Sequence, residues 1–454
     1  MKADPVRLKG HEILTAVDGG QPLDRLLVAG MDCFTTARDK AFLAELVRGS
    51  IQWRSRYDHL IDSFSRKHKP DPGPLRSLLR MSLHQLLGMD GVPAYAAIHQ
   101  AGQLCRRRPG VRQVGFVNGL LQAVRREIIG DEPEAPDHDG RQMRMRARFR
   151  TLEKDRPGWI AAWHSHPRWL VERWVARYGD QEAEAICAWN NRPVPLTFHV
   201  LPPMAVADAG QQLADAACPV RVGAVPRSLV ARERPNRTLL DSILVGAPHL
   251  IVQDQTVQAA TGWLLEGLPW VDGTVLDMCA SPGGKTAHLA ALLPDQLRIT
   301  AMDRRADRVT LLAATLKRIE RRRVDVVLGD GIRPPFGAGT FRAVLLDGPC
   351  SGTGVLRHHP EGRWRLNAAV PAVKGAFLLE LAGRAADLLT AGGRMMYGTC
   401  SLETEENESV VEALLAQRDD LEPDPDTGGI WQRSWLPHTA QGDGFFAVRL
   451  KKKD

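Results

Sequence analysis

The stretch Leu345-Leu346-Asp347-Gly348-Pro349-Cys350-Ser351-Gly352-Thr353-Gly354 joins an apolar run to a loop. The run ends in an acid, Asp347, and the loop after it carries Cys350. Proline stiffens such a loop, and glycines let its backbone take positive φ and approach a flat ligand. A similar pattern follows downstream, where the run Met395–Tyr397 leads into Gly398-Thr399-Cys400-Ser401. If both runs are strands of one parallel sheet, the two cysteines face one crevice at its carboxyl edge.

Apolar runs alternate with helical patterns over the C-terminal half of the chain, which we assign to one domain, residues 241–454. The spacing predicts strands at 274–278, 298–302, 324–328, 343–346 and 394–397, and helices at 306–319, 376–389 and 405–415. Such alternation predicts an α/β domain with a parallel, doubly wound sheet.

The loop after the first predicted strand reads Cys279-Ala280-Ser281-Pro282-Gly283-Gly284-Lys285-Thr286. It looks like the tail of a phosphate-binding P-loop, but a cysteine stands where that pattern requires its first glycine, and the dinucleotide pattern G-x-G-x-x-G is also absent. Asp303 ends the second strand, where an acid can bind both ribose hydroxyls. Asp330 ends the third and can face an adenine amino group.

This arrangement predicts a ribose-bearing ligand without a polyphosphate, such as S-adenosylmethionine. The alternative is a helix cap among ordinary surface acids. Acids at three successive strand ends (Asp303, Asp330 and Asp347) make that alternative the weaker one.

Two cysteines near a methyl-donor site suit a particular chemistry. Cytosine C5 is a poor nucleophile, but a thiolate that adds to C6 makes C5 enamine-like and able to attack a methyl sulfonium. The C5 proton and the thiolate must then leave, and Asp347 can hydrogen-bond the N3/N4 edge of the base. The target base must also leave its stack. The residues alone leave open which cysteine attacks, because DNA cytosine methyltransferases use a Pro-Cys nucleophile, here Cys350.

Residues 1–130 read as an all-helical domain with apolar stripes at helical spacing, including one that starts at Pro74 and ends at Gly88. Its polar remainder is basic, which fits either a solvated face or RNA contacts (Arg106–Arg108, Arg112, Arg125 and Arg126).

The middle of the chain contains a charged linker followed by a second predicted domain. Residues 131–158 read as a linker, first acidic and then rich in arginine (Arg141, Arg144, Arg146, Arg148 and Arg150). That arginine array fits a phosphate backbone and a solvated segment about equally. Residues 159–240 read as a small α+β RNA-binding or connector domain, in which most tryptophans are expected to fill the core.

The composition sets outer limits on the function. The chain has 454 residues and a net charge of +7, which favours a polyanionic partner. Its seven cysteines form no C-x-x-C pair and no zinc-finger spacing, so we expect free thiols in a reducing compartment and no metal site. No signal peptide or membrane-spanning stretch is visible, and we expect a cytoplasmic protein.

Three of these phrases together resemble the RNA cytosine-C5 methyltransferase family: Asp347–Gly354, Cys279–Thr286, and Tyr397–Ser401 with Glu406-Asn407-Glu408. The stretches Val92–Ala97 and Gly115–Leu121 resemble the NusB type of RNA-binding helical domain. With that domain in front, nearly the whole chain resembles the bacterial 16S ribosomal RNA methyltransferase B subfamily, also called Sun or Fmu.

The resemblance implies that Cys400 is the nucleophile and Cys350 the general base or release residue. It also implies S-adenosylmethionine contacts from Cys279–Lys285, Asp303, Asp330 and Asp347, a cytosine in ribosomal RNA as the substrate, and a monomer. Gly348, Gly398 and Ser281 depart from the family pattern. The alternatives are the same chemistry on transfer RNA or another ribosomal RNA site, and an RNA-binding assembly factor without turnover.

Overall fold

The computed structural model describes residues 3–65, 69–107, 113–130, 138–268, 272–319 and 323–454. The chain forms two compact units. One comprises residues 1–192 with 359–367, and the other comprises 193–358 with 368–454. Among the described helices, none is both long and apolar enough to cross a membrane.

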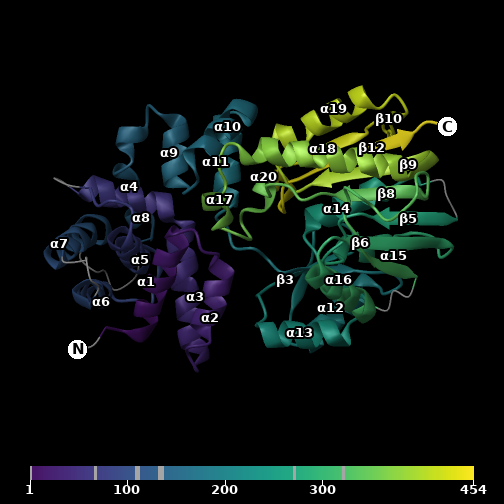
Figure 1. Cartoon of the computed structure of the whole chain (residues 1–454). Helices are drawn as coiled ribbons and strands as arrows, with labels where there is room; N and C mark the ends of the chain where they lie inside the picture. Colours follow the sequence, from purple (N-terminus) through teal and green to yellow (C-terminus); the bar gives the residue numbers. More distant parts are fainter. Residues whose placement is uncertain (1–2, 66–68, 108–112, 131–137, 269–271, 320–322) are drawn as a thin grey trace. The chain divides into compact units, whose positions relative to one another are not determined.

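The first unit is helical, as the sequence predicts (Figure 1). Its N-terminal part consists of α1 (Pro5–Asp18), α2 (Leu23–Met31), α3 (Ala37–Gln52), α4 (Arg54–Phe64), α5 (Pro74–Gly88), α6 (Ala94–Arg107), α7 (Val114–Val124) and the π-helical turn η1 (Arg125–Ile129). Helix α5 begins at the predicted proline and contacts α1, α3, α4 and α6. Its residues Leu78, Leu79, Met81 and Leu83 are fully buried, so α5 lies at the centre of this bundle.

The rest of the first unit is α8 (His138–Ala147), η2 (Arg150–Leu152), α9 (Arg156–Trp163), α10 (Arg168–Tyr178), α11 (Asp180–Trp189) and the returning segment 359–367 with α17 (Gly362–Arg365). Trp163 and Trp174 are buried, as predicted for most tryptophans. Trp169 and Trp189 are half-buried.

The first part of the predicted linker, residues 131–137, lies outside the described residues. So do Arg108 and Arg112, two of the basic residues predicted for the polar surface of the helical domain. The arginine array is helical in its first part and contacts the protein itself. Arg144 donates to the Ile128 carbonyl oxygen, Arg146 lies over the Trp159 ring, and Arg148 pairs with Glu127.

The second unit begins with a small antiparallel sheet covered by two helices. Its elements are β1 (Thr197–Val200), α12 (Val206–Asp215), β2 (Val220–Val222), β3 (Ser228–Ala231), α13 (Arg237–Gly246) and β4 (Leu250–Val252), with strand order β2-β3-β1-β4. Because β4 pairs with β1, this sheet continues past the predicted boundary at residue 240. The presence of both strands and helices agrees with the predicted α+β character.

The large sheet has eight strands in the described part of the chain. They are β5 (Gly273–Asp277), β6 (Leu297–Asp303), β7 (Val324–Leu328), β8 (Phe341–Asp347), β9 (Leu389–Thr399), β10 (Leu421–Pro423), β11 (Gln432–Trp435) and β12 (Phe445–Lys452). The order is β10-β12-β9-β8-β5-β6-β7, with β11 on β12. The five predicted strands, β5 to β9, are mutually parallel, as expected.

The sequence analysis did not foresee β10, β11 and β12, which extend the predicted parallel sheet at one edge by antiparallel pairing. Phe446 lies opposite Thr399, so the chain enters β12 at the carboxyl end of β9 and must run the other way. The resulting sheet is mixed.

Helices cover both faces of this sheet. Helices α18 (Val370–Leu388) and α19 (Glu408–Gln417) pack on one face, and α14 (Gln255–Leu265), α15 (Gly284–Leu292) and α16 (Ala306–Arg318) supply the other apolar clusters. The strand register brings the carboxyl ends of β5, β6, β7, β8 and β9 to one edge, with Asp347 opposite Gly398.

Candidate active site at the carboxyl edge of the large sheet

The structure brings the two predicted cysteines together. Cys350 and Cys400 follow the adjacent strands β8 and β9, and their sulfurs lie 3.3 Å apart. Both side chains are half-buried. The Cys350 loop is attached to the Cys400 loop, since the Gly354 N–H donates to the Cys400 carbonyl oxygen at 2.9 Å. Two thiols at this separation can act on the same small molecule.

The close approach of the two loops depends on a glycine. A Cβ at Gly354 would lie 2.5 Å from the Gly444 carbonyl oxygen and 2.9 Å from that of Cys400. Backbone atoms cannot yield as a flexible side chain can, so any larger residue would force the loops apart. The glycine predicted to let this loop approach a ligand thus has a second role in the loop packing.

The environment of Cys400 disfavours a resting thiolate. The hydrogen bond with Cys350 and burial hold the pKa of the Cys400 thiol well above its usual value, whereas the Lys285 ammonium acts in the opposite direction. The Cys400 thiol is therefore protonated at neutral pH in this state, and nucleophilic attack requires the removal of that proton.

Lys285 is the cation of this site. It stands in the first turn of α15, and its Nζ lies 2.5 Å from Asp347 Oδ2. Burial alone would lower the pKa of Lys285, but Asp347 more than compensates and the pKa is raised. The ammonium also lies over the Phe445 ring, 5.4 Å from its centroid. The sequence placed Lys285 among the cofactor contacts and missed its pairing with Asp347.

The loop Cys279–Lys285 spans the turn from β5 to α15. Gly283 has φ +105°, which favours glycine, and precedes the first helical residue, Gly284. Backbone hydrogen bonds connect the start of this loop to both neighbouring strands. The Met278 N–H donates to the Leu345 carbonyl oxygen of β8, and the Ala280 N–H donates to the Met302 carbonyl oxygen of β6.

The predicted acids lie at the expected strand ends. Asp303 is 6% exposed, and its Oδ1 accepts the Arg305 N–H at 3.0 Å, so in the described part its Oδ2 remains for a ligand. Asp330 is exposed, and its Oδ1 accepts the Ile332 N–H. Both carboxylates can bind polar groups of a ligand at this edge.

A fourth acid at this edge was missed by the sequence analysis. Asp277 ends β5, is buried, and accepts a hydrogen bond from the Thr286 hydroxyl at 2.7 Å. Burial raises its pKa to about 7. The signal was available, because Asp277 ends its strand just as Asp303 and Asp347 end theirs.

Gly348 and Gly398, which depart from the family pattern, each stand against a large side chain. A Cβ at Gly348 would lie 2.2 Å from the Leu378 side chain, and one at Gly398 would lie 2.9 Å from the Phe445 ring. Large neighbours therefore occupy the space that side chains at these positions would take.

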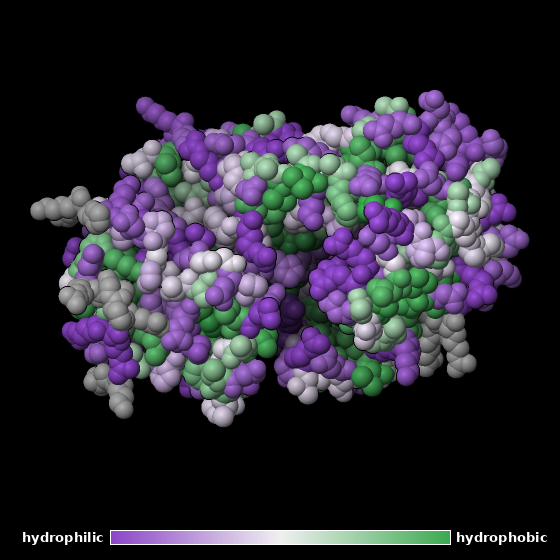
Figure 2. Space-filling model, viewed as in Figure 1, coloured by the Kyte–Doolittle hydropathy of each residue, from purple (hydrophilic) through white to green (hydrophobic). Residues whose placement is uncertain are grey.

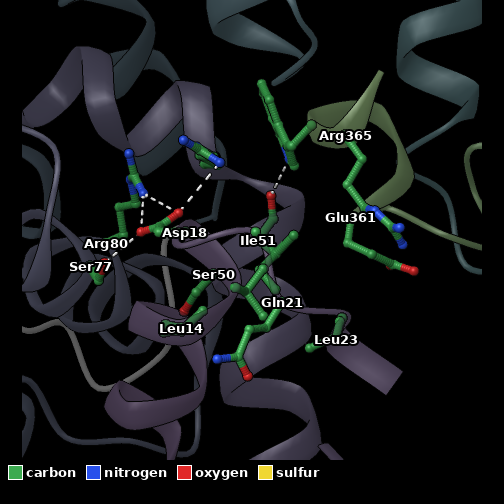
Figure 3. A pocket seen from close by; sticks show the side chains of 14 residues that line it. Leu14, Asp18, Gln21, Leu23, Ser50, Ile51, Ser77, Arg80, Glu361 and Arg365 are labelled. Atoms are coloured by element: carbon green, nitrogen blue, oxygen red, sulfur yellow. Dashed lines mark hydrogen bonds and ion pairs between the residues drawn. The ribbon is translucent and has the colours of Figure 1, made fainter. Parts of the chain in front are cut away.

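A separate cavity of about 380 Å³ lies in the helical unit, among α1, α3, α5 and the returning segment (Figure 3). None of the predicted site residues lines it. Arg80 and Ser77 bind Asp18 there, so the charges that line this cavity are largely paired with one another.

Models of known families match three parts of the chain. A 16S rRNA methyltransferase RsmB/F model matches residues 268–451, a NusB family model matches 21–126, and a ferredoxin-like domain model of RsmF/B-like methyltransferases matches 166–230.

The curated relatives span nearly the whole chain. The probable ribosomal RNA small subunit methyltransferase B of Synechocystis sp. (strain ATCC 27184 / PCC 6803 / Kazusa) is 30% identical over 91% of each chain. Ribosomal RNA small subunit methyltransferase B of Escherichia coli O17:K52:H18 is 30% identical over 96% of each chain.

Solved structures share the fold. The crystal structure of PH0851 has a TM-score of 0.71 at 24% identity and covers 100% of both chains. The structure of NSun6 from Pyrococcus horikoshii with SFG has a TM-score of 0.53 at 20% identity, and covers 63% of this chain and 98% of that one.

Proposed function

Since the chain belongs to the ribosomal RNA small subunit methyltransferase B family, we propose that it methylates C5 of a cytosine in 16S ribosomal RNA through a covalent Cys400–C6 adduct. The observation that carries this proposal is the pair of sulfurs 3.3 Å apart at adjacent strand ends. One thiol can bond to C6 while the other lies within reach of the proton that must leave C5.

S-adenosylmethionine is the cofactor, and when bound it supplies an electrophilic methyl group. The carboxyl edge fits this molecule. The Oδ2 of Asp303 is available for the ribose hydroxyls, and Asp330 is exposed for the adenine amino group. The loop Cys279–Gly284 lacks the first glycine of a triphosphate-binding loop, which agrees with a ligand without polyphosphate.

The chain's own residues then have distinct roles. Cys400 Sγ gives its proton to solvent and forms a bond to C6, and Lys285 stabilises the transient thiolate by its positive charge. Asp347 Oδ2 is bound to Lys285, which leaves Oδ1 to accept from the N4 amino group. Once C5 carries the methyl group, Cys350, acting as a thiolate, takes the C5 proton. The electron pair of that C–H bond restores the C5–C6 double bond, and the C6–S bond breaks with its electron pair leaving on the Cys400 sulfur.

The remaining domains serve RNA binding in this proposal. We assign RNA contacts to the helical domain predicted at 1–130 and to the α+β domain predicted at 159–240, of which α9, α10 and α11 lie in the helical unit and the sheet extends to β4. The predicted linker 131–158 separates these two domains, and the methyltransferase domain follows at 241–454. The net charge of +7 agrees with a polyanionic partner. Figure 2 shows hydrophilic residues interspersed with hydrophobic ones on the visible face.

The two cysteines provide the test. In Cys350→Ala, attack and methyl transfer should proceed but release should fail, so a protein–RNA adduct that survives denaturing electrophoresis should accumulate when S-adenosylmethionine is present. Cys400→Ala should form no adduct. The matched control is Cys33→Ala, which removes an exposed thiol of the helical unit and should behave as wild type.

Several results would contradict the proposal. Trapping by Cys400→Ala but not by Cys350→Ala would exchange the two roles, and full activity in both variants would make the cysteines structural. Bisulfite sequencing of small-subunit RNA from a deletion strain should reveal one cytosine that loses its C5 methyl group. Loss of the mark from transfer RNA instead would refute the 16S assignment.

A further inference from the structure

Glu406 is a buried carboxylate that is hydrogen-bonded to the residue following each of the two cysteines. It belongs to the short helix η4 (Thr404–Glu406) and is fully buried. Its Oε1 accepts the Ser351 N–H at 2.6 Å, and its Oε2 accepts the hydroxyl hydrogens of both Ser351 and Ser401. Ser351 follows Cys350 and Ser401 follows Cys400, so one carboxylate binds the neighbour of each cysteine.

A carboxylate in this position calls for an explanation. Burial of a charge is costly unless it is paired or fully hydrogen-bonded. Among the described residues no cation pairs with Glu406, and all three of its donors come from the two serines. Burial raises the pKa of Glu406, and the bonds from Ser351 and Ser401 act against that shift.

The backbone of Glu406 is itself held in place. The Tyr397 hydroxyl donates to the Glu406 carbonyl oxygen. The next residue, Asn407, accepts from the Thr399 hydroxyl and donates to the Ser401 carbonyl oxygen at 2.9 Å. Glu406 is therefore fixed to the end of β9, and from there it reaches across to the loop after β8.

We propose that Glu406 is a positioning residue. Its carboxylate links the Cys350 loop to the Cys400 loop and so keeps the two sulfurs close enough to act on the same cytosine. This inference rests on the proposed function of the cysteines and adds a group that does not touch the substrate. The loops share other bonds as well, including the Leu402 N–H to the Thr353 hydroxyl oxygen. Loss of the carboxylate should therefore loosen the pair rather than unfold the site.

The main test is Glu406→Gln in the full-length protein. Glutamine keeps the shape, but one of its two terminal atoms is an NH2 group that cannot accept, so it loses either the Ser351 N–H bond or the two serine hydroxyl bonds. A misplacement near 1 Å can cost on the order of 100-fold in rate, so we expect kcat to fall by about 10- to 100-fold. The KM for RNA and the affinity for S-adenosylmethionine should be unchanged. Glu412→Gln, which changes an exposed glutamate of α19, is the matched control.

A second measurement needs neither RNA nor cofactor. Diamide oxidises two nearby thiols to a disulfide, and peptide mass mapping then gives the rate at which Cys350 and Cys400 become joined. The Cys350–Cys400 disulfide should form rapidly in wild type and in Glu412→Gln, and more slowly in Glu406→Gln. This readout would not respond to a role in global stability alone.

The serines supply a cross-check if Glu406→Gln folds poorly. Ser401→Ala removes one of the two hydroxyl donors to Glu406, so on its own it should lower kcat and slow disulfide formation between the cysteines, by less than Glu406→Gln. Wild-type kcat and wild-type joining rate in folded Glu406→Gln and in Ser401→Ala would overturn the inference. If wild type itself made no C5-methylcytosine, the proposed function would fail, while the joining rates would still decide whether Glu406 sets the sulfur distance.

Discussion

Replacement of Asp303 by asparagine should weaken the binding of S-adenosylmethionine without unfolding the protein. The Asp303 carboxylate ends β6, is 6% exposed, and uses Oδ1 to accept the Arg305 N–H. Asparagine can keep that bond through its own oxygen. Its amide nitrogen cannot accept the ribose hydroxyl that we assign to Oδ2.

The size of the effect follows from the kind of bond that is removed. A hydrogen bond to a charged group contributes roughly 1.5–3 kcal/mol, and the small exposure of Asp303 means that water does not screen it. At about 1.4 kcal/mol for each tenfold change, the dissociation constant should rise by roughly 10- to 150-fold.

Titration calorimetry with S-adenosylmethionine measures this directly, with thermal unfolding to check that the variant is folded. Asp325→Asn is the matched control, because Asp325 is an exposed carboxylate on β7 that pairs with Arg298. A folded Asp303→Asn protein with wild-type affinity would refute the assignment of Asp303 to the ribose.

Three further expectations test other parts of the structure. Lys285→Met should raise the pKa of the Cys400 thiol further, so alkylation of Cys400 by iodoacetamide should shift to higher pH, and an unchanged pH profile would exclude the thiolate-stabilising role. Burial lowers the pKa of His199 from 6.5 to about 4, so the unfolded chain binds more protons below pH 6.5 and stability should fall by roughly 3 kcal/mol as the pH drops from 6.5 to 4. Urea unfolding should show that His199→Gln loses much of this pH dependence. Replacing the exposed Arg106, Arg107 and Arg126 by glutamine should reduce the salt slope of RNA binding by roughly 0.7 for every phosphate that is no longer neutralised. An unchanged slope would mean that the RNA does not contact these arginines.

The sequence by itself determined the fold class and most of the elements. Helical periodicity located α5 from Pro74 to Gly88, and the strand β7 has the predicted bounds, Val324–Leu328. Local patterns suffice here because each element buries its own apolar stripe or run. The acids and cysteines at strand ends were equally visible, because parallel strands bring their carboxyl ends to one edge.

Only the tertiary structure decided how distant residues pair. No pattern within β12 reveals that it runs antiparallel to β9, since direction depends on the end at which the chain enters the sheet. The Lys285–Asp347 pair and the Glu406 bonds to two serines join residues 62, 55 and 5 positions apart. Such contacts are set by strand register and loop packing, whereas a local pattern records only the period of a single element. The sequence thus determined which groups stand at the edge, and the packing of the loops decided which of them touch.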